Sequence, residues 1–274
     1  MTSVNELLAE GLLEQVRQAV AEAGSAILEI YANPAQFATE LKQDASPLTA
    51  ADKAANDILV NALQSLTPSI PILSEESTQA PWSTRQQWDR CWVVDPLDGT
   101  REFLKRNDEF TVNVALVEGH RPILGVVFAP ALDRWFFAAN GQGAWRQDGD
   151  RDPIPIQVRE KIADRPWQVV GSRSHSTPEV VEFVEQLGDA ELVAMGSSLK
   201  LCLVADGSAD LYPRLGPTCE WDTCAAHAVV DEAGGQVLHA ETGQPLTYNA
   251  RETLLNPHFI VCSTPNSAWF RKVA

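Results

Sequence analysis

Two carboxylates placed directly after an apolar run constrain this chain more than any other feature of its sequence. The run Cys91–Val94 predicts a buried strand, and the segment Asp-Pro-Leu-Asp-Gly-Thr follows it at residues 95–100. The proline favours extended geometry at Asp95, and the glycine permits a sharp turn after Asp98. The two acids can therefore converge with the Leu97 carbonyl between them, which is a set of oxygen ligands that Mg²⁺ prefers.

The same six residues also fit an ordinary turn, in which Asp95 starts an Asx turn. Two further acid clusters, Glu75-Glu76 and Asp222, weaken that explanation. Each has a simple interpretation by itself, because paired glutamates occur in solvated loops and an aspartate at a helix start interacts favourably with the helix dipole. All three clusters stand at a strand end or a helix start, so together they favour a metal site.

The hydrophobic pattern predicts helices followed by strands. Apolar residues recur every three or four positions from Leu8 to Ile30, which predicts one long amphipathic helix. A second helix is predicted from Thr49 to the residues before Pro68. Three strand-like segments divided by turn residues favour an antiparallel meander. They span residues 111–117, 123–128 and 135–139.

The charged, proline-containing segment 147–165 is the best candidate for a boundary within the chain. Strands and helices alternate beyond it, and such alternation predicts a mixed sheet covered by helices. We therefore divide the chain into an N-terminal α+β region, residues 1–150, which contains the Asp-Pro-Leu-Asp-Gly-Thr motif, and a C-terminal α/β region, residues 151–274. The second region carries Asp222 and most of the candidate substrate-binding residues.

Charge and cysteine content exclude several classes of protein. Acidic residues outnumber basic ones by 37 to 21, which gives a formal net charge of −16. Such a chain repels nucleic acid and anionic membranes, although a bound divalent cation still permits a small phosphorylated ligand.

No apolar run approaches the ~18 residues of a membrane span, and residues 1–14 lack the basic start of a secretory signal. The five cysteines form no Cys-x-x-Cys pair, so we expect reduced, mostly buried thiols in a cytoplasmic protein.

The three acid clusters, taken in order, resemble the motifs of the inositol monophosphatase superfamily of lithium-sensitive, magnesium-dependent phosphatases. The resemblance extends over roughly residues 5–265. Within the superfamily, four segments resemble the CysQ-type 3'(2'),5'-bisphosphate nucleotidases. These segments are Trp92–Phe103, Ser172–His175, Gly196–Lys200 and Tyr212–Pro217. The resemblance implies an α+β fold of layered α/β type, a five-layer αβαβα sandwich with the active-site cleft between the two regions.

The resemblance also implies a metal centre of two or three Mg²⁺ ions, which would activate a water molecule for in-line attack on a phosphate monoester. The implied metal ligands are Glu75, Asp95, the Leu97 carbonyl, Asp98 and Asp222. Glu75 would also act in catalysis by positioning the metal of the attacking water, and Asp52 and Thr100 would relay the proton of that water. Thr49 and Asp52 have the spacing of a helix capping box as well, so Asp52 also has a structural role open to it.

The residues that the resemblance implies for substrate binding lie beside the metal centre or in the second region. They are Gly99, Thr100, His175, Ser197, Lys200, Arg214 and Asp222. A second phosphate on a substrate requires cations within hydrogen-bond reach, and Lys200 and Arg214 are the only Lys or Arg residues between positions 176 and 250. On charge alone, surface solubility explains these two residues somewhat better than a role in binding. Glu220 is expected to face the ribose or the solvent.

The implied activity is removal of the 3'-phosphate of adenosine 3',5'-bisphosphate (PAP) to give AMP and phosphate, in sulfur assimilation. Phosphoadenylyl sulfate (PAPS) would be converted to adenylyl sulfate (APS) in the same way. The alternatives are hydrolysis of inositol 1-phosphate or another sugar phosphate, and a non-catalytic nucleotide-binding regulator. The expected partner is a small bisphosphate, with no nucleic acid. The oligomeric state, monomer or homodimer, stays open, and so does peripheral contact with the inner membrane face.

Overall fold

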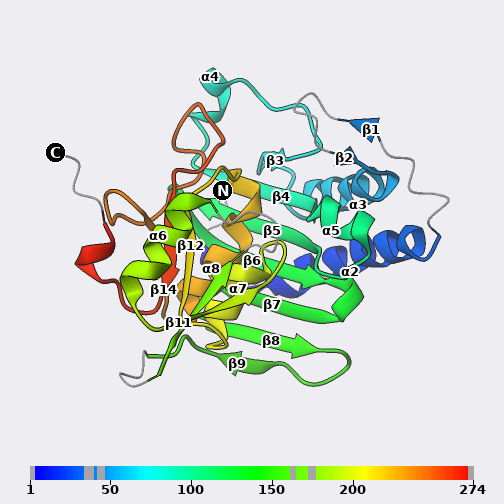
Figure 1. Cartoon of the computed structure of the whole chain (residues 1–274). Helices are drawn as coiled ribbons and strands as arrows, with labels where there is room; N and C mark the ends of the chain where they lie inside the picture. Colours follow the sequence, from blue (N-terminus) through cyan, green and yellow to red (C-terminus); the bar gives the residue numbers. More distant parts are fainter. Residues whose placement is uncertain (1–3, 34–39, 42–46, 161–164, 172–176, 271–274) are drawn as a thin grey trace.

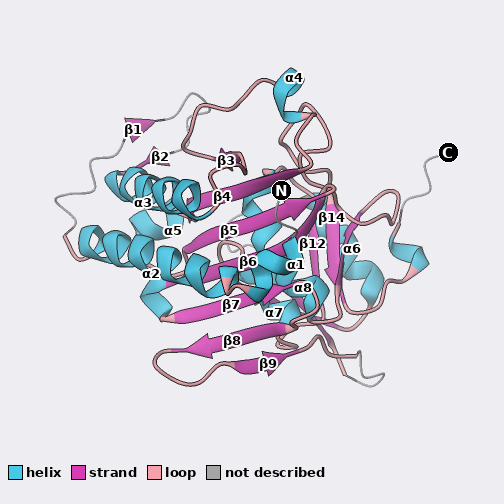
Figure 2. Cartoon of the chain, turned by 180° about the vertical axis from the view of Figure 1, so that it is seen from behind, coloured by secondary structure: helices cyan, strands magenta, loops and turns pink. Residues whose placement is uncertain are grey.

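The computed structural model describes residues 4–33, 40–41, 47–160, 165–171 and 177–270. These residues form two main β-sheets and three sets of helices, stacked in the order helix, sheet, helix, sheet, helix (Figures 1 and 2). The predicted five-layer αβαβα architecture is therefore confirmed. Each helix within the described ranges is too short or too polar to cross a membrane.

A seven-stranded sheet holds most of the N-terminal region, and its strands are ordered as in the sequence. They are β3 (Ile72–Ser74), β4 (Arg90–Asp98), β5 (Thr111–Glu118), β6 (Arg121–Ala129), β7 (Arg134–Ala139), β8 (Ala144–Asp148) and β9 (Ile154–Ile156). β3 runs parallel to β4, and the remaining neighbours are antiparallel, which confirms the predicted meander. β9 lies beyond residue 150 and still pairs with β8, so the boundary at that position stays a prediction.

Two amphipathic helices, α2 (Leu12–Tyr31) and α3 (Ala50–Leu66), pack side by side on the outer face of this sheet (Figure 2). Their apolar faces form one core with alternate residues of β4 to β7. The prediction of a single opening helix is wrong, because a short helix, α1 (Val4–Ala9), precedes α2. Gly11 separates the two helices in a left-handed conformation (φ 84°), which glycine adopts readily and which interrupts a right-handed helix.

A five-stranded mixed sheet forms the second region, with the strand order β11-β10-β12-β14-β13. Its strands are β10 (Trp167–Gly171), β11 (Ala190–Ala194), β12 (Leu211–Arg214), β13 (Gln236–His239) and β14 (Phe259–Cys262). Helix α6 (Pro178–Leu187) covers its outer face, and α7 (Leu199–Ala205) and α8 (Cys224–Glu232) lie between the two sheets (Figure 1). The predicted mixed sheet covered by helices is confirmed.

Helix α8 lies very close to the large sheet. A Cβ atom at Gly125 of β6 would stand 2.1 Å from the carbonyl oxygen of Ala225, so this approach requires glycine. The close packing places the turn before α8 next to β4. The other short elements are β1 (Glu40–Leu41), β2 (Pro47–Leu48), α4 (Trp82–Arg85), α5 (Thr100–Lys105), η2 (Pro130–Leu132), η3 (Glu220–Asp222) and η4 (Ser267–Trp269).

Candidate active site and metal centre

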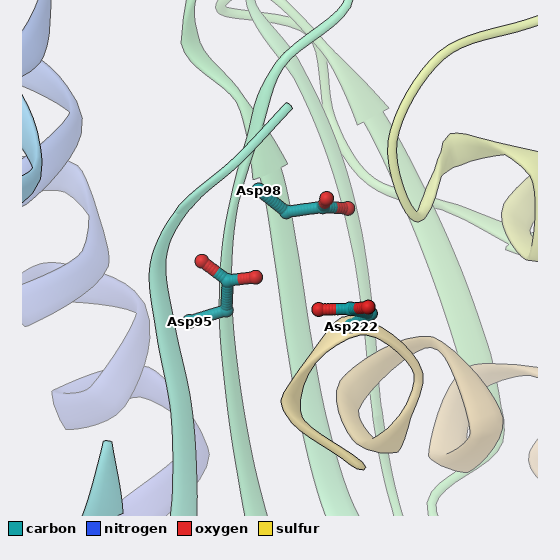
Figure 3. Close-up of side chains that lie close together, drawn as sticks. All are labelled: Asp95, Asp98 and Asp222. Carbon is teal, nitrogen blue, oxygen red and sulfur yellow. The ribbon is translucent and has the colours of Figure 1, made fainter. Parts of the chain in front are cut away.

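An irregularity in β4 brings two acids to one side of the strand. Asp95 pairs with Asn113 of β5, and Asp98 pairs with Thr111, only two positions further along β5. In a regular strand Asp95 and Asp98 would point to opposite faces, because side chains alternate. The extra residue, a β-bulge, cancels that alternation, and both carboxylates point toward Asp222 (Figure 3). The strand therefore continues through both acids rather than ending before them as predicted.

Asp222 comes from the second region and reaches the same point. It ends η3, immediately before α8, and its Oδ2 accepts a hydrogen bond from the Cys219 backbone N–H at 2.8 Å. One carboxylate oxygen from each of Asp95, Asp98 and Asp222 lies within 4.8 Å of the other two. The structure thus brings together three of the implied metal ligands from segments far apart in the sequence.

Glu75 and Leu97 lie beside these three acids. Glu75 follows β3, and its backbone N–H donates to the Val94 carbonyl at 3.1 Å. The carboxyl groups of Glu75 and Asp95 share a hydrogen bond. The Leu97 N–H donates to Asp95 Oδ1 at 3.1 Å, so the Asx turn considered as an alternative is also present. The turn and the convergence of acids are compatible.

Burial and mutual repulsion raise the pKa values of this cluster. Burial, followed by the charges of Glu75, Asp98 and Asp222, raises the pKa of Asp95 well above its usual range. Burial, followed by the charge of Asp98, raises the pKa of Asp222 to about 8. A group of mostly buried carboxylates that repel one another fits a hard divalent cation, which binds oxygen ligands. The residues present therefore fit a divalent metal.

Asp98 is held in place by the segment before α7. Its Oδ2 accepts hydrogen bonds from the Ser198 backbone N–H at 2.6 Å and from the Ser197 hydroxyl. The Ser197 carbonyl in turn accepts a hydrogen bond from the Lys200 ammonium. Ser197 lines the cavity as its implied substrate role requires, but its hydroxyl already contacts the Asp98 carboxylate.

Asp52 has both of the contacts considered for it. Its Oδ2 accepts hydrogen bonds from the Thr49 backbone N–H at 2.8 Å and from the Thr49 hydroxyl, which completes the capping box of α3. Its Oδ1 accepts a hydrogen bond from the Thr100 hydroxyl at 3.3 Å. That hydroxyl also lies 3.4 Å from the Leu97 carbonyl oxygen. The pair needed for a proton relay is therefore in contact.

An open cavity of about 160 Å³ lies beside the acids and contains basic side chains. Asp98 and Asp222 line it together with Lys200 and Arg214. Burial lowers the pKa of Lys200, and the charge of Asp98 opposes that shift. Arg214 donates from Nη2 to the Pro217 carbonyl at 2.8 Å, while its Nε is buried with no partner among the described residues. The cavity thus offers donors to an anion.

Sequence analysis missed two further cations that line this cavity, Arg101 and Lys105 of α5. They lie four residues apart, so they share one face of the helix. The spacing is visible in the sequence, but no helix was predicted there. Gly99 lies at the start of α5 with a left-handed φ of 90° and lines the same cavity, as its implied role requires.

The structure does not confirm the expectations for His175 and Glu220. His175 lies outside the described residues, so its role stays a prediction. Glu220 faces neither the ribose nor the solvent, and that expectation is wrong. Its side chain is fully buried behind η3, where the Asn249 backbone N–H donates to its Oε2. The reason is that residues distant in the sequence enclose Glu220, among them Asn249 and Leu254, which bond its side chain and its backbone N–H.

Comparison with known proteins gives consistent matches. The model of the inositol monophosphatase family matches residues 9–269. A Salmonella typhimurium protein named 3'(2'),5'-bisphosphate nucleotidase CysQ is 52% identical over 253 residues, which cover 91% of this chain and 99% of the relative. The Escherichia coli K12 protein of the same name is 50% identical over 251 residues, with the same coverage. The crystal structure of CysQ from Bacteroides thetaiotaomicron, a bacterial member of the inositol monophosphatase family, matches with a TM-score of 0.82 and 40% identity, covering 93% of this chain and 98% of that one.

Proposed function

The chain belongs to the inositol monophosphatase family, and we propose that it is a metal-dependent 3'(2'),5'-bisphosphate nucleotidase. The activity is that named for relatives 50% and 52% identical over 99% of their length. The proposed substrate is PAP, which would lose its 3'-phosphate to give AMP and phosphate. PAPS, converted to APS, is a second proposed substrate.

One observation carries the proposal: three acids from two regions converge beside a cavity that also holds Lys200 and Arg214. The acids fit a cation, and the two basic side chains fit a phosphate group that is not attacked. A sugar monophosphate has no second phosphate to bind these basic side chains, which disfavours it. A non-catalytic regulator would have no need of the complete set of ligands.

The metal centre is proposed as two or three Mg²⁺ ions. The side chains that would hold them are Glu75, Asp95, Asp98 and Asp222, together with the Leu97 carbonyl. When bound, such ions lower the pKa of a water molecule and offset the negative charge on the phosphoryl group and the departing oxygen. Most of these ligands are fixed by hydrogen bonds to neighbouring backbone or hydroxyl groups, so the centre is built before a cation arrives.

Thr100 and Asp52 are proposed to take the proton of the attacking water. A hydroxyl has one proton, and Thr100 donates it to Asp52 Oδ1, so the lone pairs of Thr100 can accept the water proton. The other oxygen of Asp52 accepts two hydrogen bonds from Thr49, which fix its orientation. The proton therefore passes from the water to Thr100 Oγ1 while the Thr100 proton passes to Asp52.

We place this activity in the cytoplasm, where it would clear PAP formed during sulfur assimilation. The five cysteines are free thiols, and four of them are buried, as the sequence predicts for a reducing compartment. The oligomeric state and peripheral contact with a membrane stay predictions.

Phosphate release tests the proposal. PAP, PAPS, inositol 1-phosphate and fructose 1,6-bisphosphate would each be assayed with Mg²⁺ and with EDTA. We expect the highest kcat/KM for PAP and no turnover in EDTA. Faster turnover of inositol 1-phosphate would favour the sugar-phosphate alternative. A rate that does not depend on metal, or no rate with any substrate, would contradict the proposed function.

A further inference from the structure

A buried chain of three polar side chains, none of them an implied metal ligand, connects the loop after β3 to η3. Arg85 of α4 donates from Nη1 to Asn249 Oδ1 at 2.7 Å, and Asn249 Nδ2 donates back to the Arg85 carbonyl at 2.8 Å. The Asn249 backbone N–H donates to Glu220 Oε2 at 2.6 Å. All three residues are buried, with exposures of 3% or less. We call Arg85, Asn249 and Glu220 the clamp.

One end of the clamp fixes η3, which carries Asp222. Glu220 is the first residue of η3 and Asp222 is the last. A single 3₁₀ turn has poor hydrogen-bond geometry and little stability of its own. The Glu220 backbone N–H donates to the Leu254 carbonyl at 2.9 Å, and its side chain is held by Asn249. Because both groups of Glu220 are anchored, the start of η3 is held in place, and the Cys219 N–H orients the Asp222 side chain at its end.

The other end of the clamp fixes the loop that begins at Glu75. Arg85 Nε donates to the Ala80 carbonyl at 3.0 Å. The neighbouring residue, Gln79, donates from its side chain to the carbonyl of Ser74, which directly precedes Glu75. The loop between Glu75 and Arg85 is therefore held at both of its ends.

Asn249 holds an uncommon backbone conformation. Its φ is 47°, in the left-handed region that non-glycine residues adopt uncommonly. Glycine would adopt this conformation at lower cost. The two hydrogen bonds to Arg85 are what the asparagine adds, and together with the bond from Arg85 Nη2 to the Glu252 carbonyl they join the N-terminal and C-terminal parts of the site.

We propose that the clamp positions the metal centre, holding Glu75 and Asp222 in place before a cation binds. Repulsion of the Asp222 carboxylate by Asp98 and Glu75 favours displacement of η3 away from β4 in the absence of a cation. The clamp opposes that displacement through contacts that touch neither metal nor substrate. Its residues are positioning residues, and the inference rests on the proposed metal-dependent function.

Mg²⁺ binding to the metal-free full-length protein, measured by titration calorimetry, tests this inference. Asn249→Gly keeps the backbone N–H to Glu220 and tolerates the left-handed φ, but removes both bonds to Arg85. Glu220→Gln keeps the shape of the side chain and removes its charge. Loss of a group that orients a metal ligand typically weakens metal binding about 10–100-fold, and we expect that range in Asn249→Gly. We expect a smaller loss in Glu220→Gln, because its amide oxygen still accepts the Asn249 N–H. We expect kcat at saturating Mg²⁺ to stay within about threefold of wild type, since the clamp touches no reacting atom.

The matched control is Asp210→Asn, far from the acids at the opposite end of β12 from Arg214. Asp210 is also a buried carboxylate that accepts a backbone N–H, that of Gln168 at 2.7 Å, and it pairs with Arg159 and Arg165. This variant should lower thermal stability and leave Mg²⁺ affinity unchanged. Wild-type Mg²⁺ affinity in Asn249→Gly would overturn the inference, and so would an equal loss of Mg²⁺ affinity in Asp210→Asn. If Glu220→Gln does not fold, the result for Asn249→Gly decides alone. If the wild type itself bound no Mg²⁺, the proposed function would fail, and the clamp would have nothing to position.

Discussion

Replacing Asp95 by Asn should make the metal-free protein more stable and the enzyme inactive. Asp95 is buried and shares its site with Asp98 and Asp222, with carboxylate oxygens within 4.8 Å. Two unit charges at that distance repel by about 3.5 kcal/mol at an effective dielectric constant of about 20. Proton uptake by the wild type already relieves part of this repulsion, so we expect a net gain of about 2 kcal/mol at pH 8.5.

The pH dependence follows from the direction of the pKa shifts. The folded-state pKa values of Asp95 and Asp222 are raised, so the wild type binds more protons when folded than when unfolded. Its metal-free stability is therefore fully present below pH ~4 and is lost as the pH rises toward 8, where Asp222 titrates. Asp95→Asn removes one of these groups, so its advantage should be small at pH 5 and large at pH 8.5.

Thermal unfolding in EDTA and in Mg²⁺ measures both effects. A gain of about 2 kcal/mol corresponds to roughly 5 °C in Tm for a chain of this size. In Mg²⁺ the order should reverse, because a cation at 100 times its Kd stabilises the wild type by about 2.7 kcal/mol and the variant binds it more weakly. Asp210→Asn is the control, and it should lose stability under all conditions, since Asp210 is paired with arginines. A Tm for Asp95→Asn below that of the wild type in EDTA at pH 8.5 would refute the reasoning.

Three variants test the proton relay and the substrate side of the site. Thr100→Val should lower kcat about 10²–10³-fold with Mg²⁺ affinity unchanged, because the hydroxyl that links the water to Asp52 is lost; a rate within tenfold of wild type would exclude the relay. Lys200→Ala with Arg214→Ala should raise KM for PAP about 100-fold and leave inositol 1-phosphate turnover similar, as measured by phosphate release; the opposite pattern would reverse the substrate ranking. Lys105→Gln should lower kcat/KM for PAP several-fold at low salt only, because Lys105 is an exposed cation at the cavity and salt screens its charge. A decrease in kcat/KM that does not depend on salt would argue for a direct contact with the substrate.

The sequence was sufficient to predict the acids but not how the backbone orients them. The motif at residues 95–100 identified two candidate ligands, and Asp222 followed from its place before a helix of small residues. The β-bulge that turns Asp95 and Asp98 to one side depends on their register with β5. Register is set by contacts between strands, and a pattern within one strand does not contain it. The prediction therefore ended the strand too early.

Glu220 shows a second limit of sequence analysis. A glutamate beside a metal ligand is expected at the surface, because charged side chains are rarely buried unless they are paired. Here the Asn249 backbone N–H supplies a hydrogen bond, and Arg251, followed by Arg85, supplies positive charge, while burial still raises the pKa of Glu220 to about 7. Helix α5 was missed for a simpler reason, since six residues are too few for a clear helical period. Helix α8 and both sheets were predicted because their apolar patterns are long or repeated.

The unequal environments of the acids predict that metal binding releases protons. Asp98 accepts two hydrogen bonds from Ser197 and Ser198, whereas Asp95 accepts one from the Leu97 N–H and lies among other carboxylates. The pKa of Asp222, raised to about 8, keeps this group largely protonated at neutral pH in the metal-free protein, and the raised pKa of Asp95 favours its protonated form as well. Mg²⁺ requires ionised ligands, so binding must displace those protons, and its affinity should rise with pH up to about 8. Calorimetry at pH 7 in buffers of different ionisation enthalpy measures the release directly, and identical apparent enthalpies in all buffers would show that the acids are already ionised.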